Sequence, residues 1–122
     1  MATPAPVQVL PPPNPNLAVW AWTLTTADHT GVALGPNFAD FVDRSVQIEG
    51  TFGGATVVLE GSNDGSNYEP LTDPQGNAIS KSAAALEQVT EVTMLVRARL
   101  SAVGVGATIV ITICARRAKF PV

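Results

Sequence analysis

Apolar and polar residues alternate along most of this chain, and that alternation constrains its fold more than any other feature. The clearest run is residues 44–52, in which Val46, Ile48 and Phe52 fall on one side and polar residues on the other. A period of two residues predicts a β-strand with one buried face. The same pattern predicts strands over residues 17–25, 44–52, 55–61, 91–101 and 104–117.

The alternation also predicts which side chains of the other strands face the core. We expect the final strand to be covered on both faces, because Val110 and Cys114 lie opposite its isoleucines. Cys114 is the only cysteine, so we expect a small buried hydrophobic residue and no disulfide within the chain. The expected inward residues are Trp20, Trp22 and Leu24; Ala55, Val57 and Leu59; Val92, Met94, Val96, Ala98 and Leu100; and Val105, Ala107, Ile109, Ile111 and Ile113.

Turns separate the expected strands, and only one segment has helical character. Gly53 and Gly54 suit a tight hairpin turn with positive φ between residues 44–52 and 55–61. Residues 80–91 contain consecutive alanines, which favour helix, but the segment is short and allows at most one helical turn. Short strands joined by turns predict an all-β fold: a single antiparallel β-sandwich, jelly-roll or immunoglobulin-like.

Proline dominates the first 16 residues, and this composition favours extended polyproline II and excludes the interior of a sheet. We therefore divide the chain into an extended Pro-rich arm (1–16), a β-sandwich domain (17–117) and a C-terminal tail (118–122). Two interpretations of the arm stay open. It is a solvated terminus, or an extended segment that binds a neighbouring molecule through the apolar side chains of Val7, Val9 and Leu10.

Charge is scarce and unevenly distributed. Charged residues make up 14% of the chain, against about a quarter in average proteins. All ten acidic side chains lie in residues 1–91, whereas residues 92–122 carry only basic ones. Either the two halves form salt bridges within a sheet, or Arg116 and Arg117 belong to complementary surfaces that meet between subunits. The net charge of −3 and the absence of aromatic residues beside the late arginines argue against nucleic-acid binding.

The polar segment from Glu60 to Ala78 has both a structural and a chemical interpretation. Residues 63–65 and 73–77 have the composition of two turns, and glycine takes positive φ in each without cost. A calcium site using Asp64, Asn67 and Asp73 is the alternative, although the order of residues does not match an EF-hand loop. We expect turns and no metal.

Catalytic chemistry has few candidates. His29 is the only histidine and lies in a turn-like cluster, which excludes a zinc site built from several histidines. Asp40 and Asp43 lie close together, but the adjacent Arg44 indicates an ion-paired loop. We therefore expect no catalytic residue, no cofactor and no enzymatic activity. The sequence contains no run of 18 apolar residues, so no membrane span is predicted.

Residues 44–117 resemble small virion proteins of tailed bacteriophages, the head decoration or cement proteins. The resemblance rests on two runs, VQIEGTFGGATVVLEGSNDGSNYEPLTDPQGNA and MLVRARLSAVGVGATIVITICARR. It implies a non-enzymatic structural protein that binds the major capsid protein, bridges neighbouring capsid subunits and forms a homo-oligomer, most simply a trimer. It also implies a location on the capsid exterior of a virion assembled in the host cytoplasm.

A second resemblance gives an alternative function. The turn SNDG followed by Tyr68 is similar to a turn of discoidin-like carbohydrate-binding jelly rolls. This resemblance implies a carbohydrate-binding or host-receptor-binding β-sandwich module on a phage particle. Those domains usually carry tryptophan where this chain has Tyr68, so we rank this function second.

Overall fold

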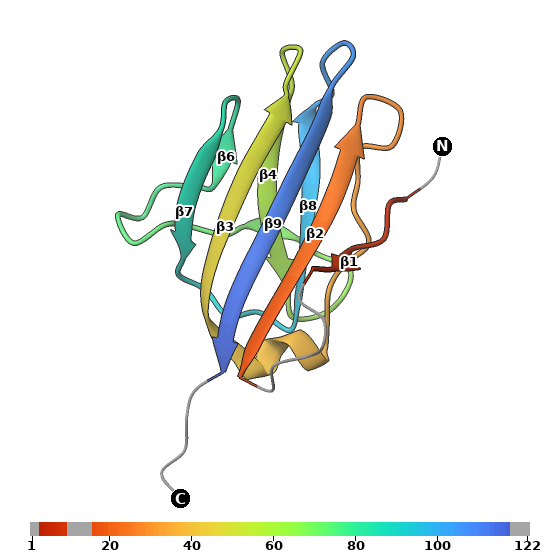
Figure 1. Ribbon diagram of the computed structural model, residues 1–122. Helices are drawn as coiled ribbons and strands as arrows, with labels where there is room; N and C mark the ends of the chain where they lie inside the picture. Colours follow the sequence, from red (N-terminus) through yellow and green to blue (C-terminus); the bar gives the residue numbers. More distant parts are fainter. Residues whose placement is uncertain (1–2, 10–15, 118–122) are drawn as a thin grey trace, which may run out of the picture.

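Two antiparallel β-sheets pack face to face in the computed structural model, which describes residues 3–9 and 16–117 (Figure 1). Sheet A contains five strands in the order β1-β2-β9-β3-β7, and sheet B pairs β4 with β5 and β6 on one side and with β8 on the other. The strands are β1 (Val7–Gln8), β2 (Leu17–Thr25), β3 (Phe41–Thr51), β4 (Thr56–Ser62), β5 (Glu69–Pro70), β6 (Ser80–Lys81), β7 (Ala85–Val89), β8 (Leu95–Ala102) and β9 (Thr108–Arg117). A short 3₁₀ helix, η1 (Asn37–Asp40), precedes β3. The predicted antiparallel β-sandwich is confirmed.

The last strand lies at the centre of sheet A. β9 pairs along its length with β2 on one side and β3 on the other, so the first and last long strands of the domain are neighbours. The turn at Gly53 and Gly54 has the expected positive φ values of 57° and 88°. It does not close a hairpin, however, because β3 belongs to sheet A and β4 to sheet B (Figure 1). The turn therefore carries the chain from one layer to the other.

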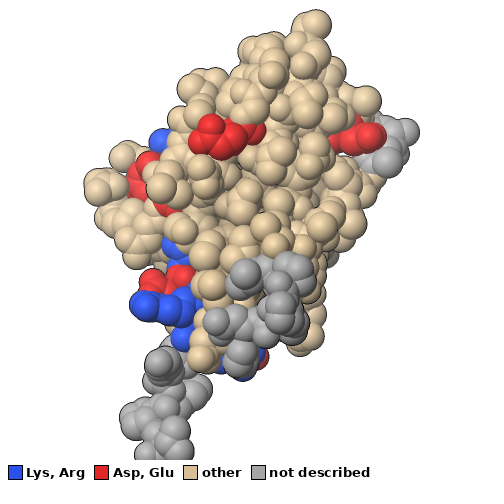
Figure 2. All heavy atoms as spheres, viewed as in Figure 1, with Lys and Arg blue, Asp and Glu red and all other residues tan. Residues whose placement is uncertain are grey.

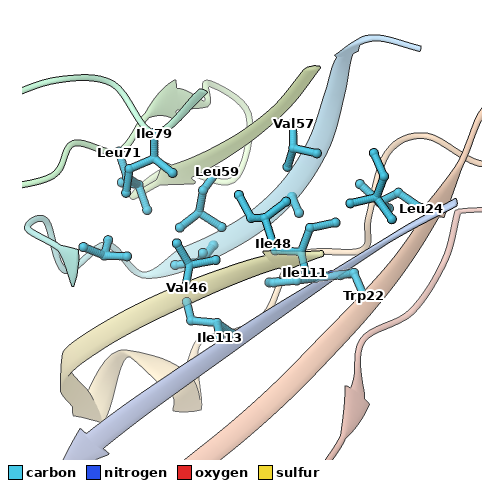
Figure 3. Close-up of a cluster of buried hydrophobic side chains, with 14 of the residues drawn as sticks. Trp22, Leu24, Val46, Ile48, Val57, Leu59, Leu71, Ile79, Ile111 and Ile113 are labelled. Carbon is cyan, nitrogen blue, oxygen red and sulfur yellow. The ribbon is translucent and has the colours of Figure 1, made fainter. Parts of the chain in front are cut away.

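The core fills the space between the two sheets (Figure 3). The alternation predicted the core side chains of the long strands, whereas Leu34, Phe38, Leu71, Ile79 and Val89 join the core from segments for which no inward residue was predicted. The core residues are large, aliphatic or aromatic, and come from both layers, so each sheet buries one face against the other. The fully buried ones include Trp22, Leu24, Val46, Ile48, Val57, Leu59, Val96, Ile109, Ile111 and Ile113.

Several inward predictions are wrong at the strand ends. Val92 and Met94 precede β8 and are 43% and 39% exposed, and Val105 lies in the turn before β9 and is 85% exposed. Each of these residues follows the alternation of its neighbours, but the strand begins after it. Alternation therefore identified the core face and not the ends of the strands.

Two further predictions are corrected. Residues 80–91, for which no strand was predicted, form β6 and β7, because pairing of β7 with the edge of β3 outweighs the helix propensity of the alanines; the limit of at most one helical turn holds, since the segment has none. The strand that is covered on both faces is β4 and not β9, since Val58, Glu60 and Ser62 on its outer face are also buried. On β9, Val110 is 39% exposed and Cys114 is only half-buried.

The described part of the arm closes one side of the sandwich. β1 pairs antiparallel with β2, and the N–H of Val9 donates to the carbonyl oxygen of Val19 (2.8 Å). The N–H of Val32 donates to the carbonyl oxygen of Pro4 (2.9 Å), and residues 31–34 hydrogen-bond in turn to β8. The arm backbone therefore connects the edge of sheet A to the edge of sheet B within the same chain. On the opposite side, Lys81 of β6 and Glu87 of β7 form an ion pair (3.7 Å) between the two sheets.

Candidate functional site

The outer surface of sheet A is a broad face with little charge, which we call the sheet A face. It consists of the outward positions of the five strands, and Figure 2 shows mostly uncharged atoms over it. Its charged side chains, among the described residues, are Glu49 near one end and the ion pair of Asp43 with Arg116 at the other. One row crosses all five strands and consists of Val7, Ala21, Thr112, Gln47 and Leu86.

Apolar side chains are exposed on this face. Val7 is 66% exposed, Leu86 67% and Val110 39%. They come from β1, β7 and β9, so they are spread from one edge of the sheet to the other. A sheet surface with few charges and with exposed valine and leucine is suited to contact with another protein, since interface cores are depleted of charged residues.

The second candidate lies on the outer surface of sheet B and centres on a buried carboxylate. Glu60 of β4 accepts hydrogen bonds from Nε of Arg97 (2.7 Å) and from Nε and Nη2 of Arg99 (3.1 and 3.2 Å). Both arginines belong to the neighbouring strand β8, where Arg97 lies opposite Glu60. The guanidinium carbon of Arg97 lies 3.7 Å from the centre of the Tyr68 ring. We call these four residues the Glu60 cluster.

The arginines control the ionisation of Glu60. Burial opposes the charged form, but hydrogen bonds from Arg99 and Arg97, together with their positive charges, hold the pKa of Glu60 below its ordinary value. The carboxylate therefore stays ionised although the residue is only 2% exposed. Its negative charge is compensated within the cluster by two partly exposed cations.

Acid is expected to destabilise the fold through Glu60. Because its pKa is lower in the folded chain, its stabilising contribution is complete above its ordinary pKa and is lost as pH falls through the folded pKa. Urea unfolding from pH about 7 to about 3 should therefore show a smaller acid-induced loss in Glu60→Gln than in the wild type. Glu69→Gln removes an exposed carboxyl from neighbouring β5 and is the matched control. Identical pH profiles for wild type and Glu60→Gln would exclude this role.

The segment from Glu60 to Ala78 forms the two expected turns. Oδ1 of Asp64 accepts hydrogen bonds from the N–H groups of Ser66 and Asn67, and its Oδ2 accepts one from Nδ2 of Asn67. These bonds, together with one from the Ser62 hydroxyl, lower the pKa of the Asp64 carboxyl. Asp73 caps the second turn in the same way by accepting from two backbone N–H groups. The backbone of each turn thus already uses the carboxylate that a calcium site would need.

Calcium should therefore not affect stability. Thermal unfolding with calcium and with a chelator should give the same midpoint. Calcium would raise the midpoint only if it bound the folded state, and no carboxylate of the two turns is free to bind it. In Asp64→Ala, the turn loses its acceptor and the melting temperature should fall equally in both buffers. A rise of several degrees with calcium in the wild type would restore the metal interpretation.

The sequence-based catalytic candidates do not form a shared site. His29 is half-buried, with its Nδ1 3.4 Å from the Thr30 hydroxyl. Arg44 does not form the ion-paired loop expected with Asp40 and Asp43. It is buried, donates to the carbonyl oxygens of Phe41 (2.6 Å) and Phe38 (3.1 Å), and its pKa is lowered by burial to about 10.

The described residues contain no group of three or more His, Cys, Asp and Glu side chains placed to hold a metal ion. Among the same residues, no helix is long and apolar enough to cross a membrane.

The five predicted partner-binding residues are not brought together. Val7 and Val9 lie at the β2 edge with exposed side chains, and Leu10 lies outside the described residues. Arg116 lies on the sheet A face, ion-paired with Asp43. Arg117 turns the other way and stacks over the Phe41 ring at 4.8 Å.

Arg117 lines an apolar groove of about 720 Å³ between the arm, the start of β2 and η1. Its Nε is buried and has no hydrogen-bond partner among the described residues. The remaining walls are mainly apolar and include Trp20, Val32, Phe38 and Phe41.

The Glu60 cluster was missed at the level of sequence. The alternation that places Val96, Ala98 and Leu100 inward also places Arg97 and Arg99 on the outer face, but the strand that would face them could not be identified. The only available signal was a glutamate at an outward position in the otherwise apolar run of residues 55–61.

Comparison with known proteins adds little to this description. No protein-family model matches the chain, and no curated protein matches it. Among solved structures, a cupin domain from Bordetella pertussis is 12% identical, with a TM-score of 0.30, over 98% of this chain and 99% of that one. A similarity at that level carries no argument about fold or function.

Proposed function

We propose that this chain is a non-enzymatic structural protein of a bacteriophage particle, a decoration or cement protein that stabilises the head by bridging neighbouring capsid subunits. Two things support the proposal: the resemblance of residues 44–117 to such proteins, and the sheet A face. The sheet A face is the observation that carries most weight, because a wide surface with few charges and with exposed Val7, Leu86 and Val110 suits burial against protein.

The proposed mechanism is removal of apolar surface from water. Each Å² of apolar surface buried in a contact contributes roughly 25 cal/mol, before the costs of association. The sheet fixes the backbone beneath the exposed side chains, and valine and leucine have few rotamers, so little conformational entropy is lost when they are covered. No catalytic residue, metal or cofactor takes part in this function.

Self-association is part of the proposal. A trimer repeats one interface, formed by two different patches of the chain, around a closed axis, which avoids open-ended growth. In this arrangement the sheet A face of one copy meets a second copy, and the remaining exposed surface meets the major capsid protein. The assembled particle forms in the host cytoplasm, and the protein lies on the capsid exterior.

Val110→Glu tests the role of the sheet A face. It places a carboxylate directly opposite Glu49 on the neighbouring strand, so self-association should weaken at least about tenfold, equivalent to roughly 1.4 kcal/mol. Val105→Glu is the matched control, since it makes the same change at an 85% exposed residue in the turn before β9. The measurement is light scattering at micromolar concentrations, with circular dichroism to confirm folding. A monomeric wild type, or equal effects of both substitutions, would contradict the proposed interface.

A further inference from the structure

The Glu60 cluster has more hydrogen-bond donors than its own carboxylate uses. A guanidinium carries five N–H donors. Arg97 directs its Nε to Glu60, and Arg99 directs its Nε and Nη2 there. The other N–H groups of these two side chains make no hydrogen bond to the described residues. The side chains of Arg97 and Arg99 are 27% and 34% exposed, so the remaining donors are accessible from solvent.

The two guanidiniums are held in place before any ligand arrives. Glu60, whose side chain is 3% exposed, holds both arginines through its hydrogen bonds. The centre of the Tyr68 ring lies 3.7 Å from the guanidinium carbon of Arg97. Side chains that are already ordered lose little entropy on binding a ligand. Arginine also presents its donors in a planar fork that matches the two oxygens of a carboxylate.

The charge balance of the cluster favours a ligand with a single negative charge. Two arginines and one glutamate leave the cluster with a single surplus positive charge, within a chain whose net charge is −3. A long polyanion such as nucleic acid would be repelled by the rest of the molecule, whereas one carboxylate matches the local surplus. Tyr68 is half-buried and gives one ring face to Arg97, which makes it poorly placed to stack on a sugar.

We propose that Arg97 and Arg99 form a docking site for a carboxylate, supplied by an acidic side chain of a partner protein. The site lies on sheet B, on the opposite side of the sandwich from the sheet A face, and does not depend on the identity of the particle or on self-association. It gives the protein a second, polar contact of defined geometry. Specificity comes from the arginine fork, and Glu60 and Tyr68 position that fork without contacting the ligand.

Side-chain NMR of the full chain can test this inference directly. The probe is a blocked Gly-Glu-Gly peptide, with blocked Gly-Gln-Gly as the neutral control and glucuronic acid as the acidic-sugar control. We expect the glutamate peptide to shift the guanidinium signals of Arg97 and Arg99 saturably in the millimolar range, with weaker binding at high salt. The glutamine peptide should produce no saturable shift.

Substitutions of the arginines distinguish the contribution of the planar guanidinium geometry to affinity from that of positive charge alone. Arg99→Lys keeps the charge but loses the planar fork, so affinity for the glutamate peptide should fall several-fold, and Arg99→Gln should lower it at least about tenfold. Arg116→Gln, which removes an exposed arginine from the sheet A face, should leave it unchanged. If Arg99→Gln does not fold, the comparison of glutamate and glutamine peptides on the wild type still decides.

Three results would overturn the proposal. The first is that the glutamate peptide produces no saturable shift. The second is that it binds no better than the glutamine peptide. The third is that Arg99→Lys and Arg116→Gln have the same effect on its affinity. A stronger response to glucuronic acid than to the glutamate peptide would assign the site to an acidic sugar and reject the protein partner.

Discussion

Trp22→Ala is expected to destabilise the domain by about 3–5 kcal/mol, the range typical of removing a large aromatic side chain from a core. Trp22 is fully buried between the sheets, and its indole N–H donates to the carbonyl oxygen of Val32 (2.7 Å). The substitution thus leaves a cavity and an unpaired acceptor. Against a total stability of roughly 5–15 kcal/mol, this loss should be clear in urea unfolding.

Trp22→Phe separates the two contributions. It keeps most of the ring volume but removes the donor to Val32, so the loss should be smaller, about 1–3 kcal/mol. A loss below about 1 kcal/mol for Trp22→Ala would mean that the core described around this residue is wrong.

Deletion of residues 1–15 should lower the free energy of unfolding by about 2–4 kcal/mol, since each hydrogen bond contributes roughly 0.5–1.5 kcal/mol. The deletion removes the pairing of β1 with β2 and the bond from Val32 to Pro4, and it leaves the edge of sheet A open. Asn16 stays because its carbonyl oxygen accepts from the N–H of Arg117. From the sequence alone we would expect an independent arm whose removal leaves the melting of the domain unchanged.

A double substitution, Val7→Thr with Val9→Thr, is the control for this deletion. Both side chains are mostly exposed, and the backbone bonds remain, so stability should change by less than about 0.5 kcal/mol. If the arm also binds a neighbouring molecule, the double substitution weakens that contact without unfolding the domain. Equal melting temperatures for the deletion and the wild type would show that the arm does not hold the two sheets together.

Local pattern was sufficient to find the long strands and the core side chains that they contribute. The alternation around Val46 and Ile48 and around Ile109 and Ile111 reflects burial of one sheet face, and each of these residues is fully buried. Arg44 follows the same period as Val46, so its burial was also encoded in the pattern. The neighbouring aspartates favoured an ion-paired loop instead, because the actual partners of Arg44, backbone oxygens of Phe38 and Phe41, could not be inferred from the sequence.

Strand pairing was beyond what local pattern could predict. The glycines at positions 53 and 54 have the same backbone requirement whether a turn closes a hairpin or crosses between sheets. The Glu60 cluster depends on β4 and β8 being neighbours, although more than 30 residues separate Glu60 from Arg97 along the chain. Residues 85–89 form a strand because they pair with the edge of β3, and this tertiary contact outweighs the local propensity for helix.

Quantitative mass spectrometry of purified phage particles tests the proposed function most directly, with the major capsid protein as the internal reference. A decoration protein should be present in many copies per particle, at a fixed ratio to the capsid protein, and Val110→Glu should lower that ratio where Val105→Glu does not. Absence from the particle, or a few copies at a single location, would contradict a role in bridging capsid subunits.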